Sequence, residues 1–321
     1  MIYLLLKIIL LLVGILLTAA YLVLVERKLL GRFQIRYGPN RVGPFGIWQP
    51  IADGLKLLAK EDTVPAGANR MVFFLAPAMV ALVPLLIFAV VPLGRDLAIN
   101  GRTVPLVISD LNIGLLYMLA LSSLGVYGVV LGGWASNSKF SMLGGLRSAA
   151  QMISYELALG LSLVPVVMLA GSFSLVDIVN SQAHYPFILV QPLAFIIFLL
   201  AATAEAKRMP FDLPEAENEL MAGYHTEYSG MRFALYFLGE YVNMIALGAL
   251  IAVFFLGGWR GPWLPPLLWL ILKTLLVPIF LIWTRAIQPR LRYDQLMAFG
   301  WKLLLPLALA NIVITGLVLL W

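Results

Sequence analysis

The chain has 321 residues, of which 62% are hydrophobic and only 12% are charged, and its formal net charge is +6. A soluble domain of this length needs far more charged surface, so the composition excludes an ordinary soluble protein. The absence of cysteine excludes disulfides and cysteine-ligated clusters, and two distant histidines, His184 and His225, argue against a haem or zinc site. Any redox centres that this protein works with therefore belong to partner chains.

Stretches of about 20 apolar residues recur along the chain, and each is long enough to cross the ~30 Å hydrocarbon core as a helix. Helices satisfy their own backbone hydrogen bonds in lipid, and these stretches lack the alternation of barrel strands. We therefore predict an all-α polytopic membrane protein that forms a single membrane domain over 1–321. The eight predicted transmembrane helices lie at about 2–25, 71–93, 111–134, 148–171, 187–206, 232–257, 264–285 and 299–320. The first of these runs is too long for a cleavable signal peptide, so we interpret it as a retained span.

Basic residues divide the connecting loops into two groups. The opposite loops hold only Arg95, Arg102 and Arg260, whereas nearly all other lysines and arginines lie in segments 26–70, 135–147, 207–232 and 285–298. The positive-inside rule makes the second group cytoplasmic. Eight spans then place both termini outside.

The first cytoplasmic loop contains a helical pattern. Its apolar residues recur at helical spacing, and its polar residues form another face: these are Trp48, Ile51, Leu55 and Leu58, and Asp53, Lys56 and Lys60. The pattern predicts an amphipathic helix over 48–60 that lies in the membrane interface. The residues alone leave open whether this helix is only a surface anchor.

Three ionisable residues lie inside predicted spans, where a charge costs several kcal/mol. Glu156 and Glu240 each lie about eight residues from the cytoplasmic side, roughly 12 Å deep, and Lys273 lies near the middle of its span. At comparable depth the three would form a buried proton-transfer group, because burial raises carboxylate pKa values and a lysine lowers them again. The alternative is a buried ion pair that only fixes helix register. We favour the proton relay, because a structural ion pair needs only two charged residues and the spans contain three.

The segment 204–230 is acidic although it lies on the basic face. Asp212 is a good N-cap, with Pro214 in the first turn and Glu215 at the capping-box position, and Gly223 is a plausible C-cap, so we predict a short helix. A solvated charge run is the alternative. Apolar residues interleaved with the acids favour a partly buried functional segment instead; they are Phe211, Leu213, Leu220, Met221, Tyr224 and Tyr228.

Long motifs across the chain resemble one family. They read ERKLLG from Glu26, RYGPNRVGP from Arg36, QPIADGLK from Gln49, KED from Lys60, SYE from Ser154, PFDLPEAE from Pro210, EL from Glu219, EY from Glu227, GEY from Gly239 and RLRYDQL from Arg290. The set resembles the NuoH membrane subunit of respiratory complex I, whose mitochondrial counterpart is NADH dehydrogenase subunit 1. It covers nearly the whole chain in order and includes the count of eight spans.

The resemblance implies a non-redox subunit of a proton-translocating NADH:quinone oxidoreductase, a translocase, in the bacterial inner membrane with both termini periplasmic. Loops 26–70 and 204–231 would form the quinone chamber with the two peripheral-arm subunits nearest the membrane, and ubiquinone or menaquinone would be the substrate. FMN and iron–sulfur clusters would belong to partner subunits, and this chain would bind no cofactor and have no activity alone. Other implied partners are adjacent small membrane subunits and the lipid bilayer, but not nucleic acid.

Two groups of site residues follow from the resemblance and from the buried charges, and neither includes a catalytic residue or a metal ligand. Reduction to quinol needs two protons, and basic residues stabilise transient negative charge on a quinone headgroup. The quinone-chamber group comprises Glu26, Arg27, Arg36, Arg41, Asp53, Lys56, Arg208, Phe211, Tyr228, Arg285 and Arg292. The proton-relay group comprises Glu205, Asp212, Glu215, Glu217, Glu219 and Glu227, which lead inward to Glu156, Glu240 and Lys273.

Two segments depart from the family pattern. The usual Ala-Glu-Thr-Asn-Arg before the Pro-Phe-Asp motif is here Ala204-Glu-Ala-Lys-Arg208, and Ala286-Ile-Gln-Pro289 replaces a stretch with an aromatic residue. These two departures leave open which quinone and which electron donor the complex uses. One alternative is the equivalent subunit of a complex fed by ferredoxin or another donor, or of a membrane-bound hydrogenase. A secondary transporter is a distant alternative, because it would predict interrupted helices at the midplane and repeat symmetry.

Overall fold

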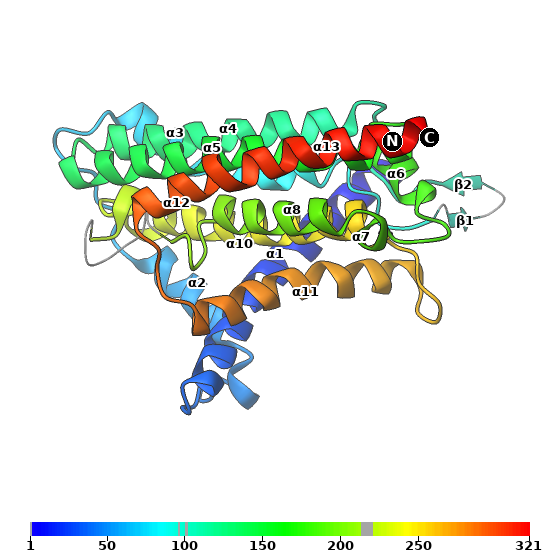
Figure 1. The fold of residues 1–321 in the computed structure, drawn as a ribbon. Coiled ribbons are helices and arrows are strands. Elements are labelled where there is room, and N and C mark those ends of the chain that lie inside the picture. Colours follow the sequence, from blue (N-terminus) through cyan, green and yellow to red (C-terminus); the bar gives the residue numbers. More distant parts are fainter. Residues whose placement is uncertain (1, 96, 100–101, 213–220) are drawn as a thin grey trace.

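The apolar stretches form long helices in the computed structural model, which describes residues 2–95, 97–99, 102–212 and 221–321 (Figure 1). Among these residues, seven helices are long and apolar enough to cross a membrane. They are α1 (Ile2–Phe33), α3 (Arg70–Ile87), α4 (Gly114–Ala135), α5 (Lys139–Ala170), α10 (Gly230–Phe255), α11 (Pro266–Ile287) and the run Tyr293–Leu320. That run comprises α12 (Tyr293–Phe299), a π-helical turn (Gly300–Leu304) and α13 (Leu305–Leu320). The prediction of an all-α polytopic membrane protein is confirmed.

The fifth predicted span, 187–206, corresponds to two shorter helices, α7 (Phe187–Val190) and α8 (Pro192–Glu205). The count of eight spans therefore stays a prediction. Smaller elements are α2 (Gln49–Ala59), α6 (Leu175–Ser181), 3-10 turns at Pro44–Gly46 and Gly223–His225, and an antiparallel pair of β1 (Leu97–Ile99) and β2 (Arg102–Val104). This short hairpin was not predicted from the sequence.

Two helices extend beyond the predicted spans by about two turns. Helix α1 continues past residue 25 to Phe33, and α5 begins at Lys139 rather than at 148. Each has 32 residues, which corresponds to about 48 Å at ~1.5 Å per residue and exceeds the ~30 Å hydrocarbon core. Glutamate, arginine and lysine are good helix formers, so a helix can continue beyond the bilayer where hydrophobicity ends.

Helix α10 occupies the centre of the bundle. It lies between the helices α3, α4, α5 and α13 on one side and α1 and α11 on the other (Figure 1). In its most apolar window 78% of the residues are buried, compared with 22% for α1 and for Tyr293–Leu320. Helix α10 is therefore the helix around which the others pack, and α1 and α13 are peripheral.

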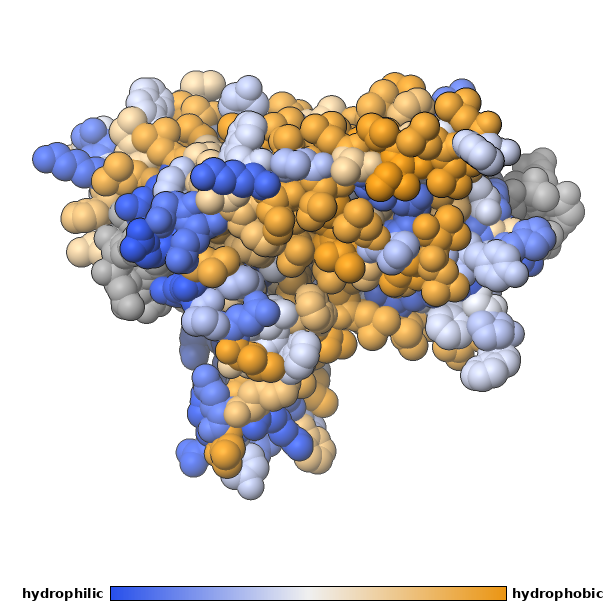
Figure 2. Space-filling model, viewed as in Figure 1, coloured by the Kyte–Doolittle hydropathy of each residue, from blue (hydrophilic) through white to orange (hydrophobic). Residues whose placement is uncertain are grey.

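The ends of the bundle differ. The two termini and the hairpin lie at one end, and the predicted cytoplasmic segments gather at the other (Figure 1). The amphipathic pattern at 48–60 is confirmed as helix α2, which projects from the bundle with the end of α1 (Figures 1 and 2). All of α2 is described and none of it is buried, and the side chains of Ile51, Leu55 and Leu58 are at least half exposed.

Glycine allows α10 to approach its neighbours closely. A Cβ atom on Gly239 would lie 2.6 Å from the carbonyl oxygen of Val80 in α3, and one on Gly248 would lie closer still to that of Thr274 in α11. Small residues at such contacts are typical of membrane helices, where packing replaces the hydrophobic driving force. Gly239 directly precedes Glu240, so this contact also fixes the position of that carboxylate.

We expect Gly239→Ala to destabilise the folded chain by about 1–3 kcal/mol, because the added methyl meets backbone that must shift. Gly160→Ala in α5 is the matched control, since its nearest contact would be a side-chain atom at an ordinary 3.9 Å. The control should be neutral or stabilising by up to about 1 kcal/mol, the usual helix preference for alanine. Thermal unfolding in detergent checks this, and equal effects of the two variants would contradict it.

Candidate functional site

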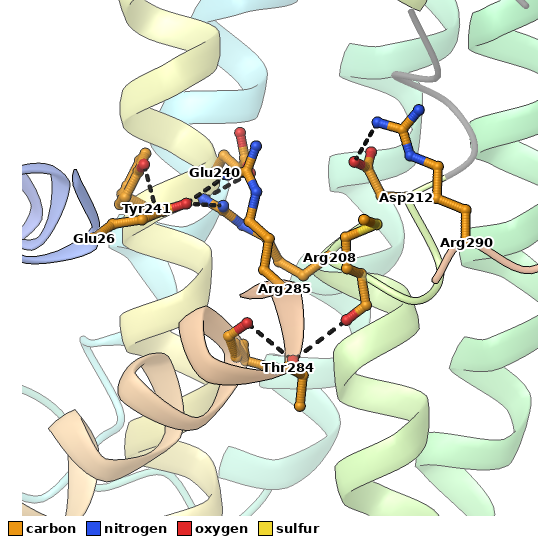
Figure 3. Close-up of polar contacts among 10 residues, drawn as sticks. Glu26, Arg208, Asp212, Glu240, Tyr241, Thr284, Arg285 and Arg290 are labelled. Atoms are coloured by element: carbon orange, nitrogen blue, oxygen red, sulfur yellow. Dashed lines mark hydrogen bonds and ion pairs between the residues drawn. The ribbon is translucent and has the colours of Figure 1, made fainter. Parts of the chain in front are cut away.

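Arg208 lies at the centre of a buried ion cluster at the predicted cytoplasmic end (Figure 3). Its Nη1 donates to Oε1 of Glu26 at 2.9 Å, and its Nη2 lies 2.8 Å from Oε1 of Glu240. The guanidinium also lies over the ring of Tyr241, 5.0 Å from the ring centroid. Burial alone would lower the pKa of Arg208, but the two carboxylates raise it overall, so the group stays charged.

Glu26 is the anion that joins this cluster together. Its Oε1 accepts from Arg208 and from Nη1 of Arg285, and its Oε2 accepts from the hydroxyl of Tyr241 at 2.7 Å. These partners come from the segment after α8, from α11 and from α10, whereas Glu26 itself belongs to α1. A carboxylate that is only 2% exposed is stable here because three donors replace its water shell.

The turn that carries Arg208 is held by two other side chains. Helix α8 ends at Glu205, and Nε2 of Gln151 in α5 donates to the carbonyls of both Ala204 and Phe211, each at 2.8 Å. The hydroxyl of Thr284 in α11 donates to the carbonyl of Met209 at 3.4 Å (Figure 3). Both ends of the turn are thus anchored to neighbouring helices, which fixes the direction of the guanidinium.

Two adjacent serines of α4 hold the carboxylates of Glu205 and Glu156. The hydroxyl of Ser122 donates to Oε1 of Glu205 at 2.5 Å, and the hydroxyl of Ser123 donates to Oε1 of Glu156. Glu205 is buried at the end of α8, and Glu156 lies on α5. Because the serines are neighbours in the chain, they bring carboxylates from two different helices to one level of the bundle.

A small cavity of about 40 Å³ separates Glu205 from Glu240. Its polar lining comprises Ser122, Glu205, Lys207, Tyr224, Glu240 and Asn243. A water molecule needs roughly 10–15 Å³ of such space and two to four polar partners. The cavity therefore suits water, which would bridge the two carboxylates.

Lys207 forms one wall of this cavity and is buried. Its Nζ lies 3.0 Å from the hydroxyl of Tyr224 and 4.5 Å from the centroid of the same ring. Its φ angle is 54°, in the left-handed region that favours glycine. The departure from the family pattern at this position thus adds a cation directly to the acidic cavity.

Asp212 and His225 are two further titratable residues near Glu240. The Asp212 carboxylate lies 3.4 Å from Nη2 of Arg290 (Figure 3). Burial raises its pKa, although Arg290 and Arg285 partly oppose the change. Burial lowers the pKa of His225 to about 4, so that its imidazole is neutral at physiological pH.

The structure brings together only part of the predicted quinone-chamber group. Glu26, Arg208 and Arg285 meet directly, and Arg27 pairs with Asp53 at 2.6 Å where α1 meets α2. Exposed residues of the predicted group lie outside the cluster; Arg292 pairs with its neighbour Asp294, and the others are Arg36, Arg41 and Lys56.

Two aromatic members of the predicted group are buried in the interior. Phe211 packs against Tyr155 and Phe299, with ring centroids 5.6 Å and 6.3 Å away. Tyr228 stacks on Phe73 at 4.0 Å. These contacts confirm that the acidic segment is partly buried where it is described, and they position its backbone.

The grouping of Lys273 with Glu156 and Glu240 was wrong. Its Nζ donates to the carbonyls of Leu256, Gly258 and Arg260, at 2.5, 3.0 and 2.7 Å. These carbonyls follow the far end of α10, about 24 Å along the helix from Glu240 at ~1.5 Å per residue. Lys273 therefore caps unpaired carbonyls at a helix C-terminus, which is a favourable position for a cation.

The remaining relay residues are only partly described. Glu227 is half-buried beside Tyr228. Glu215, Glu217 and Glu219, with the helix predicted to carry them, lie outside the described residues. Among the residues that the structure describes, no group of three His, Asp or Glu side chains is arranged to hold a metal ion.

Several residues that complete the site were not predicted from the sequence: Ser122, Ser123, Gln151, Lys207, Tyr241 and Arg290. A polar Ser-Ser pair within an apolar span, and a glutamine within another, could have indicated Ser122, Ser123 and Gln151, because buried polar groups in lipid need partners. The departure from the family pattern drew attention to the segment of Lys207 but not to its contact with Tyr224, and no local pattern identifies Arg290, whose partner Asp212 lies 78 residues away.

Comparison with known proteins places this arrangement in a family context. A family model described as NADH dehydrogenase matches residues 6–316. An NADH-quinone oxidoreductase H subunit of Syntrophobacter fumaroxidans is 67% identical over 315 residues, covering 98% of this chain and 95% of the relative. The same kind of subunit from Geobacter metallireducens is 63% identical over 302 residues, and that of Syntrophotalea carbinolica is 63% identical over 303 residues. Each of these two alignments covers 94% of this chain and 92% of the relative.

We expect Glu26→Ala to destabilise the chain by about 3–5 kcal/mol, because it leaves Arg208 and Arg285 without their shared anion. Asp53→Ala removes the partner of Arg27, whose side chain is 45% exposed, and should cost about 0–1 kcal/mol. Thermal unfolding of the full chain in detergent measures both. Similar losses from the two variants would show that burial of the Glu26 cluster does not govern its strength.

We expect His225 to make the chain sensitive to acid. Its pKa of about 4 when folded lies below the usual value, so the unfolded chain takes up a proton first as the pH falls below ~6.5. At pH 5 this should cost about 2 kcal/mol relative to pH 7. His225→Gln should therefore lose less thermal stability between pH 7 and pH 5 than the unmodified chain. His184→Gln, at an exposed histidine, is the control and should behave like the unmodified chain.

Proposed function

Because this chain belongs to the family of NADH-quinone oxidoreductase H subunits, which are membrane subunits of respiratory complex I, we propose that it forms the quinone-binding chamber and links quinone reduction to proton translocation. It is a multi-pass protein of the bacterial inner membrane, and its partners are the other subunits of the complex and the surrounding lipid.

The observation that supports this proposal is a series of neighbouring polar groups within an apolar bundle. It begins at Glu26 and Arg208, continues through Glu240 and the small cavity to Glu205, and reaches Glu156 by the two serines of α4. Charges inside membrane spans are costly, and such carboxylate chains usually serve proton movement. In our proposal the segments 26–70 and 204–231 form the quinone chamber, and Glu215, Glu217, Glu219 and Glu227 would extend the path toward the quinone.

The chemistry of quinone reduction fits the charges at this end. A quinone becomes a quinol when it gains two electrons and two protons. In our proposal FMN and iron–sulfur centres of the partner subunits supply the electrons, and this chain supplies no redox group. Arg208, Arg285 and Arg290 provide positive charge near the developing oxyanion, and Asp212, whose pKa is raised by burial, can hold and release a proton.

The surface beside this end suits a quinone tail. Helix α2 presents the exposed side chains of Ile51, Leu55 and Leu58 next to the final turns of α1 (Figure 1). An amphipathic helix in the membrane interface gives an isoprenoid chain an apolar border as it leaves the bilayer. We therefore propose that quinone enters between α1 and α2, with peripheral-arm subunits closing the chamber above them.

The orientation and the enzyme class follow from the same proposal. The basic loops gather at the end that carries the site, which supports a cytoplasmic chamber and two periplasmic termini. The chain then acts as a non-redox subunit of a translocase and should have no activity by itself.

We expect Glu205→Gln and Glu156→Gln to leave the complex assembled but to slow quinone reduction at least tenfold, because a lost acid–base group typically costs about 10²–10⁴-fold and neighbouring carboxylates compensate in part. The assay follows quinone reduction and proton uptake in inverted membrane vesicles. NADH oxidation by a water-soluble acceptor, which uses only the partner subunits, should not change.

Asp177→Asn is the matched control for these variants. Asp177 also accepts from a serine, Ser172 at 2.8 Å, but it is exposed at the opposite end of the bundle. It should leave rate and proton-to-electron ratio unchanged. Normal rates and ratios in both glutamate variants would refute the relay.

A further inference from the structure

A second, apolar cavity lies apart from the small polar cavity between Glu205 and Glu240. It has a volume of about 370 Å³ and lies among α1, α10, α11 and the segment that follows α3. Leu10 and Gly14 of α1, Ala249 of α10 and Leu270 of α11 are among its lining residues. Apolar cavities of roughly 150 Å³ stay dry and bind apolar ligands, so hydrocarbon rather than water is the natural occupant of this one.

The length of the cavity matches one leaflet of a bilayer. Its lining on α1 runs from Lys7 to Thr18, which corresponds to about 16 Å at ~1.5 Å per residue. Half of the hydrocarbon core measures about 15 Å. The cavity therefore begins near the membrane surface on the side of the termini and ends near the midplane.

Lys7 places a positive charge at the surface end of the cavity. Its Nζ donates to the carbonyls of Pro105 and Val107, at 2.8 Å and 3.1 Å, and these bonds hold the ammonium at the mouth. An ammonium has three N–H donors, and these contacts use two. The depth and the charge suit a lipid phosphate, because lysines near helix ends extend toward the interface.

Gly14 is unexplained by contacts within the described chain. A Cβ atom there would meet no described heavy atom within 4 Å, so no neighbouring helix requires a glycine. Glycine in the middle of a helix is destabilising relative to alanine. Its position in the cavity wall gives it a role, because a bare backbone leaves room for a hydrocarbon chain to lie against α1.

We propose that this cavity is a binding site for one acyl chain of an anionic phospholipid from the leaflet on the side of the termini, with Lys7 at the phosphate. The cation at the surface end distinguishes this occupant from a quinone, whose headgroup belongs at the opposite end beside Arg208. A bound lipid would fill the space between α1 and α11 and hold the peripheral helix α1 in place.

The test measures lipid retention by the purified complex. The complex is washed with detergent and exchanged into nanodiscs that contain phosphatidylglycerol or phosphatidylcholine, and bound lipid is quantified by native mass spectrometry. Gly14→Leu and Ala249→Phe fill the cavity from opposite walls and should each lower retained phosphatidylglycerol at least tenfold. Lys7→Gln should keep a bound lipid but remove the preference for phosphatidylglycerol over phosphatidylcholine.

Two control variants change the same chemistry elsewhere. Val313→Phe adds bulk at a lipid-facing position of α13, and Lys302→Gln removes an exposed cation at the other end. Both should retain lipid like the unmodified complex. The proposal would be overturned if either cavity-filling variant retained phosphatidylglycerol like the unmodified complex. It would also be overturned if these variants lost bound quinone while their bound lipid stayed unchanged.

The unmodified complex provides a measurement that does not depend on variant folding. Phosphatidylglycerol spin-labelled midway along its acyl chain should show a motionally restricted component larger than that of phosphatidylcholine with the same label. Equal components for the two lipids would overturn the assignment of Lys7 to the headgroup.

Discussion

The buried charge of Arg208 is the constraint on which the rest of this structure depends. An unpaired guanidinium in a low-dielectric interior is costly, so Arg208 requires carboxylates on both sides, and Glu26 and Glu240 supply them from α1 and α10. Glu26 in turn requires Arg285 and Tyr241. One buried cation therefore determines where four separate segments meet at this end of the bundle.

The polar path is stable because neighbouring helices provide hydrogen-bond partners for its buried polar groups. Ser122 and Ser123 each donate to a glutamate, Gln151 secures the turn after α8, and the small cavity leaves room for water between Glu205 and Glu240. A path built in this way is strongly held yet able to exchange protons, since hydroxyls and water can both donate and accept. In the proposed function, the contacts that stabilise these charges are also the ones that would transfer protons.

Helix α10 packs closely against its neighbours, whereas a cavity remains beside the peripheral helix α1. Gly239 and Gly248 let α10 touch α3 and α11 closely, and this places Glu240 beside Arg208. The apolar cavity lies among α1, α10 and α11 beside Gly14. The central helices thus form a rigid support for the polar path, whereas the peripheral helix α1 depends more on its surroundings.

The sequence by itself determined the membrane class, the approximate spans, the amphipathic helix and the family, because hydrophobicity and motif identity are local and add along the chain. It also identified Glu26, Arg208 and Glu240 as site residues. Only the tertiary structure decided which of them meet: Glu26 and Arg208 are 182 residues apart, and no local pattern encodes their contact. Lys273 shows the reason, since position along a span can be counted from sequence, but helix rotation and relative depth are set by packing against neighbours.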